Sequence, residues 1–328
     1  MTVPAKVTAI ICTYNRAQTL APTVVSLLAQ KMPENVGWEI LIVDNNSKDE
    51  TRAVVEDFQK RFPRRVRYLF ESKQGLSHAR NAGIQNANGQ IIAFIDDDET
   101  ADPEWLVNLT SNLGSCEWAG AGGRVLPPDS FSRPKWLSSN HSFIFGPISI
   151  FDRGTAPTQL CEPPFGANMA YRKDMFEKYG LFRTDLGRVG TNLISNEDTE
   201  FGRRLIAGGE RLRYEPAALT FHPVEKSRMK KKYFLSWWFN KGRSDVREAG
   251  NSQGGKHILG GHLKLIRDIV VETVRWGITS DPSDRFVCKL KIWAYAGQGY
   301  ESWLQWRGAK AKRKESAASA QPPASANS

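Results

Sequence analysis

The chain has 328 residues, of which 40% are hydrophobic and 24% charged, so it is long enough for one large domain with an appendage or for two domains. Its apolar runs are shorter than the roughly 18 residues that a membrane-spanning helix needs, which argues against an integral membrane protein. The formal net charge of +10 predicts an anionic partner, such as a nucleoside diphosphate, an anionic membrane surface or nucleic acid.

The beginning of the chain shows no signal-peptide pattern, because its first apolar run is interrupted at Thr13. We therefore expect a cytoplasmic protein, either free or held peripherally at the inner face of the cell membrane. The four cysteines are widely spaced and form no C-x-x-C pair, which argues against a zinc site or a disulfide framework.

Four apolar runs open the chain, and helical patterns separate them. Residues 7–13, 38–43, 66–70 and 91–95 predict buried strands, whereas residues 18–30, 50–61 and 77–88 predict helices. This alternation predicts an α/β fold with a mostly parallel, twisted sheet flanked by helices. In such a sheet the carboxyl ends of the strands meet at one edge, where ligands bind. We call this edge the strand-end rim.

An acidic cluster follows the fourth predicted strand. Asp96, Asp97 and Asp98 are consecutive, and Glu99 comes next. If strand alternation continued, Asp96 and Asp98 would share one side and Asp97 the other. Converging carboxylates repel unless a cation lies between them, and Mg²⁺ or Mn²⁺ prefers oxygen ligands shared with substrate phosphates. The alternative is a solvated acidic turn.

Two other segments belong to the same rim. The loop from Thr13 to Arg16, which includes Asn15, ends the first strand, and Asp44 ends the second. A carboxylate in this place suits hydrogen bonding to a nucleoside base or ribose. Because Asn-Asn-Ser follows Asp44, a simple turn is the alternative.

A glycine-rich strand is predicted for residues 118–125, where the missing side chains let another backbone or a ligand approach closely. Its glycines match neither a phosphate loop nor a dinucleotide-binding fingerprint, which argues against nucleotide-hydrolysing P-loop proteins and dehydrogenases. Residues 127–164 show little periodicity and are interpreted as a lid or acceptor loop.

Three further polar positions stand out in the second half. Asn168 is polar in an apolar setting at the start of a predicted strand. Glu197 and Asp198 open a predicted helix, where they either complement the helix dipole or provide a rigidly aimed general base. His222 follows a predicted strand at 212–219 and is either structural or within reach of a metal or phosphate.

Seven short motifs, taken in this order, resemble family 2 of the nucleotide-sugar glycosyltransferases, which have the GT-A fold. Each motif is common alone, but the ordered set is specific, and it covers roughly residues 6–225. The motifs are T-Y-N-R and V-D-N-N-S-x-D-x-T after the first two strands, G-L-S-x-A-R-N-x-G, I-D-D-D, P-x-W-L, G-A-N-M-A, and N-E-D-T-E-F-x-x-R-L.

The resemblance implies an inverting transfer of a sugar from a nucleoside-diphosphate sugar, with a UDP-sugar favoured, to an acceptor hydroxyl in cell-surface polysaccharide or glycolipid assembly. Asp198 would be the catalytic base, with Glu197 as its substitute. Asp96 and Asp98 would be the D-x-D pair, with Asp98 holding the metal. His222 is added as a possible metal ligand from its own place at a strand end. The implied acceptor is a saccharide or a lipid-linked saccharide. The processive members carry a Q-x-x-R-W motif and membrane spans, which this sequence lacks, so addition of a single sugar is favoured.

The donor site is assigned to the rim, with Arg80 on the diphosphate side and residues 166–168 against the sugar or acceptor. Its proposed members are Thr13, Asn15, Arg16, Asp44, Arg80, Asp96, Asp97 and Asn168. One alternative is a nucleotidyltransferase with a GT-A-like fold, which the missing glycine-rich basic loop after the first strand argues against. Another is a non-catalytic membrane-binding or nucleic-acid-binding protein, with nucleic acid the less favoured partner.

The C-terminal third is basic and aromatic. Residues 226–243 contain seven basic and no acidic residues, which suits a membrane interface, a sugar-binding surface, or a helix that buries its aromatic side chains. Helices are predicted for 262–278 and 284–306. The two helices could pack as a hairpin or lie on a lipid surface. The mixed charges of the first helix favour the hairpin. The resulting domains are 1–225, a helical appendage at 226–306, and a basic, then disordered tail at 307–328.

Overall fold

The computed structural model describes residues 5–137, 142–250 and 258–319. The chain forms two compact units, Met1–Phe234 and Leu235–Ser328, each described by itself below. The first unit extends beyond residue 225 because Phe234 is fully buried in it, where its ring packs edge-on against Trp136 at 5.1 Å.

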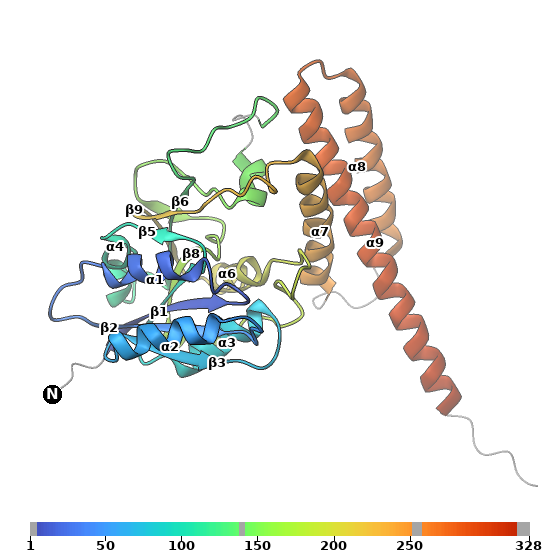
Figure 1. Cartoon of the computed structure of the whole chain (residues 1–328). Coiled ribbons are helices and arrows are strands. Elements are labelled where there is room, and N and C mark those ends of the chain that lie inside the picture. The colour runs from blue at the N-terminus through green and yellow to red at the C-terminus, as the bar shows by residue number, and fades with distance from the viewer. Residues whose placement is uncertain (1–4, 138–141, 251–257, 320–328) are drawn as a thin grey trace, which may run out of the picture. The chain divides into compact units, whose positions relative to one another are not determined.

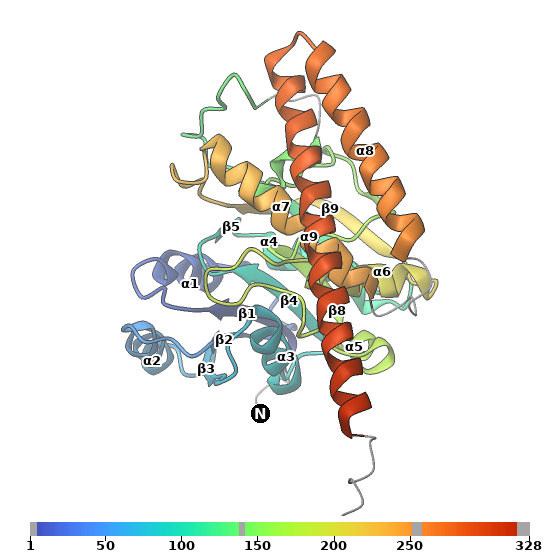
Figure 2. The same cartoon turned by 90° about the vertical axis from the view of Figure 1, so that its right-hand side faces the viewer.

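The four predicted N-terminal strands form a parallel sheet in the order β3-β2-β1-β4, as expected; Figure 1 labels the first three, and Figure 2 labels all four. The strands are β1 (Ala5–Thr13), β2 (Gly37–Asp44), β3 (Val66–Phe70) and β4 (Ile91–Asp96), and the helices between them are α1 (Leu20–Leu28), α2 (Thr51–Arg61) and α3 (Leu76–Asn86). Thr13 pairs with Asp44, and Cys12 pairs with Asp96. The polar ends of these strands therefore converge, as the sequence predicted.

The other half of the sheet is mixed. It contains β5 (Thr100–Ala101), β6 (Gly120–Leu126), β7 (Thr158–Leu160), β8 (Asn168–Arg172) and β9 (Leu212–Phe221). β8 runs antiparallel to β4 and β6, whereas β6 runs parallel to β9. The short strand β5 pairs with the end of β9, Thr100 against Phe221. This pairing brings His222 next to the acidic residues that precede β5.

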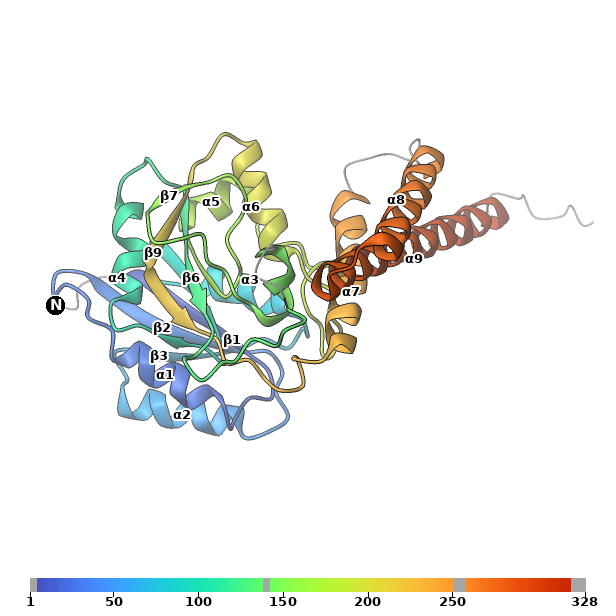
Figure 3. The ribbon, with the colours of Figure 1, turned by 90° about the horizontal axis from the view of Figure 1, so that it is seen from above.

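Both faces of the sheet are buried, so the strands are almost continuously apolar. Along β1, Ile11 belongs to one core cluster and Ile10 to the other. Helices α1, α2 and α4 (Trp105–Thr110) cover the first face, and α3, α5 (Lys173–Tyr179) and α6 (Glu197–Ala207) cover the second (Figure 3). The short 3₁₀ helices η1 (Ser111–Gly114) and η2 (Ser142–Ile148) complete this unit.

The glycine-rich strand β6 is closely approached by its neighbours, as predicted. A Cβ atom on Gly122 would lie 2.2 Å from the Pro164 side chain, and one on Gly123 would lie 2.1 Å from the Ala218 carbonyl oxygen. Any larger residue would push these segments apart.

The second unit is helical. It contains most of α7 (Lys231–Gly250), together with α8 (Ile258–Ile278) and α9 (Pro282–Ser319), and the last two run side by side (Figure 2). The predicted hairpin is therefore present. α9 continues past residue 307 to Ser319, and residues 320–328 of the predicted disordered tail lie outside the described residues.

In the described part of the chain, no helix is both long and apolar enough to cross a membrane.

Glycines let α7 and α9 cross closely within the second unit. A Cβ atom on Gly297 would lie 1.9 Å from the Phe239 carbonyl oxygen, and one on Gly242 would lie 1.9 Å from that of Ala294. Beside this crossing, the buried Glu301 accepts hydrogen bonds from Arg243 at 2.9 Å and from Arg247 at 2.7 Å. The glycines and the ion pairs thus join the same two helices.

We expect Gly297→Ala to lower the stability of the second unit by about 1–3 kcal/mol, because the added methyl group meets backbone that has no room to move. Gly308→Ala is the control, since a Cβ atom there meets nothing within 4 Å. This control should be neutral or stabilising by up to about 1 kcal/mol. Urea unfolding and amide hydrogen exchange of α9 measure both variants. Equal stabilities would contradict the close crossing.

Candidate active site

The acidic cluster lies at the end of β4. The strand ends at Asp96, and Asp97 and Asp98 form the turn that follows, so the alternation expected for Asp97 no longer applies. Arg16 lies beside both turn residues: its Nε is 3.8 Å from Asp97 Oδ1, and its Nη2 is 3.7 Å from Asp98 Oδ2. The structure thus brings the Thr13–Arg16 loop and the acidic cluster together, as predicted for the rim.

The cluster is electrostatically crowded. Burial and, to a smaller extent, the charge of Asp98 together raise the pKa of Asp97 to about 7. Arg228 adds a second guanidinium, with its Nη2 3.9 Å from Asp98 Oδ2. Sequence reasoning missed Arg228 because it lies in the basic segment 226–243, where no single residue stands out.

Three side chains next to this turn form a candidate metal site. One ligand atom from each of Asp96, Glu99 and His222 lies within 4.8 Å of the other two. Within the described residues, neither carboxylate oxygen of Glu99 nor Nδ1 of His222 has a hydrogen-bond partner, although all three atoms are buried. Buried polar atoms without partners are costly, and a divalent cation would satisfy them.

The protonation states of these groups follow from burial. Burial lowers the pKa of His222, which keeps its ring neutral and able to bind a metal. Burial also raises the pKa of Glu99 well above its ordinary value, and the charges of Asp96 and Asp98 add to the rise. Asp98 is the predicted principal ligand, and its Oδ1 lies 3.5 Å from His222 Nε2.

Glu99 was not among the predicted ligands, although it directly continues the Asp triplet. Glu99 becomes a candidate only through the pairing of β5 with β9, which brings residues 99 and 222 together. The sequence alone does not reveal this pairing. The structure therefore supports Asp96 and His222 as candidate ligands and adds Glu99. The residues present fit a hard divalent cation, since their donors are two carboxylates and one imidazole.

The first turn of α6 faces the same region. Asp198 is half-buried, and its Oδ2 accepts a hydrogen bond from the Gly166 amide at 2.7 Å. Its Oδ1 accepts one from the Thr199 amide, also at 2.7 Å. The carboxylate is therefore held in one orientation, as a general base requires.

A buried guanidinium connects α6 to the rim. Arg80 Nη1 donates to Glu197 Oε1 at 2.7 Å, and its Nη2 donates to the Gly166 carbonyl oxygen at 3.1 Å. The same Nη2 lies 3.8 Å from Asp96 Oδ1. Burial and the charge of Asp198 raise the pKa of Glu197, Arg80 lowers it, and the net result is a pKa of about 7. Glu197 is thus buried and paired, whereas Asp198 is only partly buried.

Asp44 is buried at the end of β2, with both carboxylate oxygens engaged. Ser47 donates its amide hydrogen to Oδ1 at 2.9 Å, and the Tyr68 hydroxyl donates to Oδ2 at 3.0 Å. The turn considered for Asp44 is therefore present. Each oxygen retains a second lone pair, so a donor contact is compatible with this turn. Asn15 belongs to the same loop cluster, with its Oδ1 accepting from the Lys48 amide at 2.7 Å.

Asn168 pairs with Ile95, the residue before Asp96, and its side chain points into the interior. Its side chain is fully buried, accepts a hydrogen bond from Trp105 Nε1 at 2.9 Å, and donates to the Ala218 carbonyl oxygen at 2.8 Å. These bonds tie β8 to α4 and to β9. These bonds give the Asn168 side chain a structural role, and its contact with the donor or acceptor stays a prediction.

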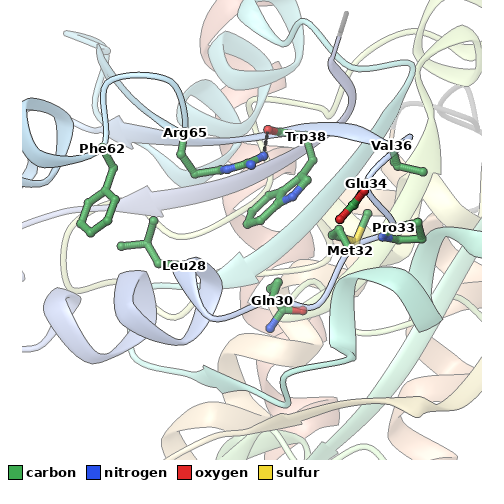
Figure 4. A pocket seen from close by; sticks show the side chains of 9 residues that line it. All are labelled: Leu28, Gln30, Met32, Pro33, Glu34, Val36, Trp38, Phe62 and Arg65. Atoms are coloured by element: carbon green, nitrogen blue, oxygen red, sulfur yellow. Dashed lines mark hydrogen bonds between the residues drawn. The ribbon is translucent and has the colours of Figure 1, made fainter. Parts of the chain in front are cut away.

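A cavity of about 380 Å³ lies near the opposite, amino-terminal end of β2 (Figure 4). The Arg65 guanidinium stacks on the Trp38 ring, 4.0 Å from its centroid, and donates a hydrogen bond to the Trp38 carbonyl oxygen. None of the predicted site residues lines this cavity; its lining is Leu28, Gln30, Met32, Pro33, Glu34, Val36, Trp38, Phe62 and Arg65.

The chain belongs to glycosyl transferase family 2, whose profile matches residues 8–180. It is 27% identical over 238 residues to the succinoglycan biosynthesis protein ExoM of Rhizobium meliloti, covering 72% of this chain and 73% of that protein. It is 34% identical over 216 residues to a Campylobacter jejuni protein named GalNAc(5)-diNAcBac-PP-undecaprenol beta-1,3-glucosyltransferase. This match covers 57% of this chain and 68% of that protein. The family and these relatives support glycosyl transfer as the class of activity of this chain. The relatives themselves are named for polysaccharide and glycolipid biosynthesis.

The fold has the same architecture as known GT-A transferases. The mannosyltransferase PcManGT of Pyrobaculum calidifontis, solved with GDP-Man and Mn²⁺, superposes with a TM-score of 0.61 at 18% identity, covering 92% of this chain and 89% of that one. The GT-A-like fold predicted from the motifs is therefore confirmed.

We expect Arg80→Met to cost about 3–5 kcal/mol of stability, because it leaves the carboxylate of Glu197 buried without its partner. The pKa of Glu197 already lies near 7 with Arg80 present. Protonation below that pH relieves the unpaired charge, so the cost of the substitution should grow as the pH rises through about 7.

The double variant Arg80→Met/Glu197→Gln should recover most of this loss, because neither remaining side chain is charged. Arg61→Met is the control, since its ion pair with Asp57 is exposed and should be worth less than about 1 kcal/mol. Urea unfolding at several pH values measures all four proteins. An equal, small cost for Arg80→Met and Arg61→Met would contradict a buried ion pair.

Proposed function

We propose that this protein is an inverting, divalent-metal-dependent glycosyltransferase that moves one sugar from a nucleoside-diphosphate sugar, with a UDP-sugar favoured, to an acceptor hydroxyl. The observation that carries the proposal is the connected network at the rim. Gly166 binds Asp198 through its amide and Arg80 through its carbonyl, and Arg80 in turn lies beside Asp96. A candidate base and a candidate metal site thus belong to one rigid arrangement.

In the proposed reaction, Asp198 removes the proton of the acceptor hydroxyl as its oxygen attacks the anomeric carbon. A new bond forms from that carbon to the acceptor oxygen, while the bond to the diphosphate oxygen breaks and its electron pair leaves with the nucleoside diphosphate. Attack from the face opposite the diphosphate inverts the anomeric configuration. Asp198 suits this step because it is only partly buried and its carboxylate is held by two backbone amides.

The diphosphate is proposed to lie against the acidic turn. Mg²⁺ or Mn²⁺ held by Asp96, Glu99 and His222, with Asp98 beside them, would offset charge on the leaving group. Arg16 and Arg228, which share Asp98, are the cations that would turn toward the phosphates. Asp44 is proposed to contact the base or ribose, with Thr13, Asn15 and Asp97 completing the donor site.

The proposed acceptor is a saccharide or a lipid-linked saccharide, in the assembly of cell-surface polysaccharide or glycolipid. The names of the relatives support it, since one concerns succinoglycan biosynthesis and the other a saccharide on undecaprenyl diphosphate. An enzyme that acts on such an acceptor would be held peripherally at the inner face of the cell membrane.

Asp198→Asn should lower turnover by about 10²- to 10⁴-fold, the usual contribution of a general base, and leave donor binding nearly unchanged. Turnover is measured as nucleoside diphosphate released with a saccharide acceptor, and binding by calorimetry. Asp174→Asn, at an exposed position in α5, is the control and should keep wild-type turnover. If Asp198→Asn is fully active, Glu197 or another group is the base.

Asp98→Ala should weaken donor binding about 10- to 100-fold in the presence of metal, because it removes charge that holds the ion and orients His222. Calorimetry with UDP-, GDP- and dTDP-sugars, with and without Mn²⁺ or Mg²⁺, compares the variant with the wild type. We expect metal-dependent binding of one nucleotide class. Wild-type binding that is equal with and without metal would contradict metal dependence, and no binding of any donor would contradict the donor site.

A further inference from the structure

The helix α8 in the second unit carries an exposed apolar stripe. Five side chains spaced three or four residues apart, and therefore on one helical face, are each more than half exposed. They are Leu263 at 69%, Ile266 at 58%, Val270 at 54%, Val274 at 57% and Ile278 at 78%. A helix in a folded protein normally buries such a face, so this stripe requires an explanation.

The side of α8 that packs on α9 is mixed: Leu265 meets α9 beside Gly299, and the most buried described side chain of α8 is the charged Glu272. Glu272 is 95% buried there, and its Oε1 accepts hydrogen bonds from Arg275 at 3.0 Å and from Lys291 of α9 at 3.4 Å. The sequence had favoured hairpin packing because of these mixed charges. The hairpin does form, with Leu265 and Glu272 on its inner side, and the apolar stripe is left outward.

Large aromatic side chains are also exposed on the two helices. Trp276 of α8 and four residues of α9 are each at least 40% exposed. The four are Trp293 at 40%, Tyr300 at 44%, Trp303 at 44% and Trp306 at 47%. Tryptophan and tyrosine are typical of membrane interfaces, where an apolar ring lies among lipid tails and its polar atom lies at the headgroups.

The charge of this unit identifies the kind of surface. From residue 235 to the end, fifteen Lys and Arg residues stand against eight Asp and Glu residues, so this unit holds +7 of the chain's net charge of +10. Such an excess attracts anionic lipid headgroups. It disfavours a second copy of the chain as the occupant, because two like-charged units repel.

We propose that the apolar stripe of α8, together with the exposed aromatic side chains of α9, docks on an anionic lipid surface. The helices lie in the headgroup region rather than crossing the bilayer, in keeping with an amphipathic face flanked by basic residues. The proposal deepens the proposed function, on which it rests for the need to meet a lipid-linked acceptor. It names the surface that holds the enzyme at the membrane.

Vesicle flotation of the full-length protein tests this proposal. The wild type should float with vesicles of phosphatidylglycerol and phosphatidylcholine in equal parts, and much less with phosphatidylcholine alone. Val270→Asp/Val274→Asp should reduce binding to the anionic vesicles about tenfold or more, because it places two charges in the stripe. Both positions are exposed, so the helix itself should tolerate the change.

Val25→Asp is the matched control, since Val25 is 55% exposed on α1 of the first unit and outside the stripe. It should float like the wild type. Trp303→Ser tests the aromatic side chains of α9 separately and should weaken binding on its own. Circular dichroism and nucleotide binding, measured without vesicles, verify that every variant is folded with an intact donor site.

Equal flotation of the stripe variant and the wild type overturns the proposal, as does a failure of the wild type to bind anionic vesicles. A wild-type dimer in light scattering that Val270→Asp/Val274→Asp converts to a monomer also overturns it, because a second copy would then cover the stripe. Vesicle binding does not require turnover. An inactive protein that still floats would therefore contradict the proposed function and leave this inference standing.

Discussion

A single buried guanidinium connects the parts of the catalytic unit that lie far apart in the sequence. Arg80 of α3 binds Glu197 at the start of α6, the carbonyl group of Gly166 before β8, and the neighbourhood of Asp96 at the end of β4. Burying a charge is costly, and it is tolerated only where partners surround it. This requirement fixes the first turn of α6 against the strand-end rim and orients Asp198 next to it.

The rim also concentrates negative charge, and the protein balances that charge with its own cations. Arg16 and Arg228 lie near Asp98, which reduces the repulsion among adjacent carboxylates. Glu99 and His222, however, keep buried polar atoms that have no partner within the described residues. The unpartnered atoms of Glu99 and His222 suit a cation, and the neighbouring guanidinium groups of Arg16 and Arg228 suit a phosphate.

The second unit buries both apolar and charged side chains and leaves an apolar stripe exposed. Its helices join through buried ion pairs, Glu272 with Lys291 and Glu301 with Arg243, and they cross closely because Gly242 and Gly297 have no side chains. The apolar stripe of α8 is therefore not needed for its own helical packing. A surface of this kind costs free energy in water, and contact with lipid would recover it.

The sequence by itself determined the parallel half of the sheet, because four apolar runs with polar ends leave few alternatives for the chain. It also identified the ordered motifs, and with them the family and the acidic turn. These signals are local in the chain. The tertiary structure decided what depends on distant contacts: the pairing of β5 with β9 brought Glu99 to His222, the packing around β8 buried Asn168, and the fold of residues 226–234 brought Arg228 to Asp98. It also decided which face of α8 is buried, because periodicity reveals that a helix has two faces but not which one meets its neighbour.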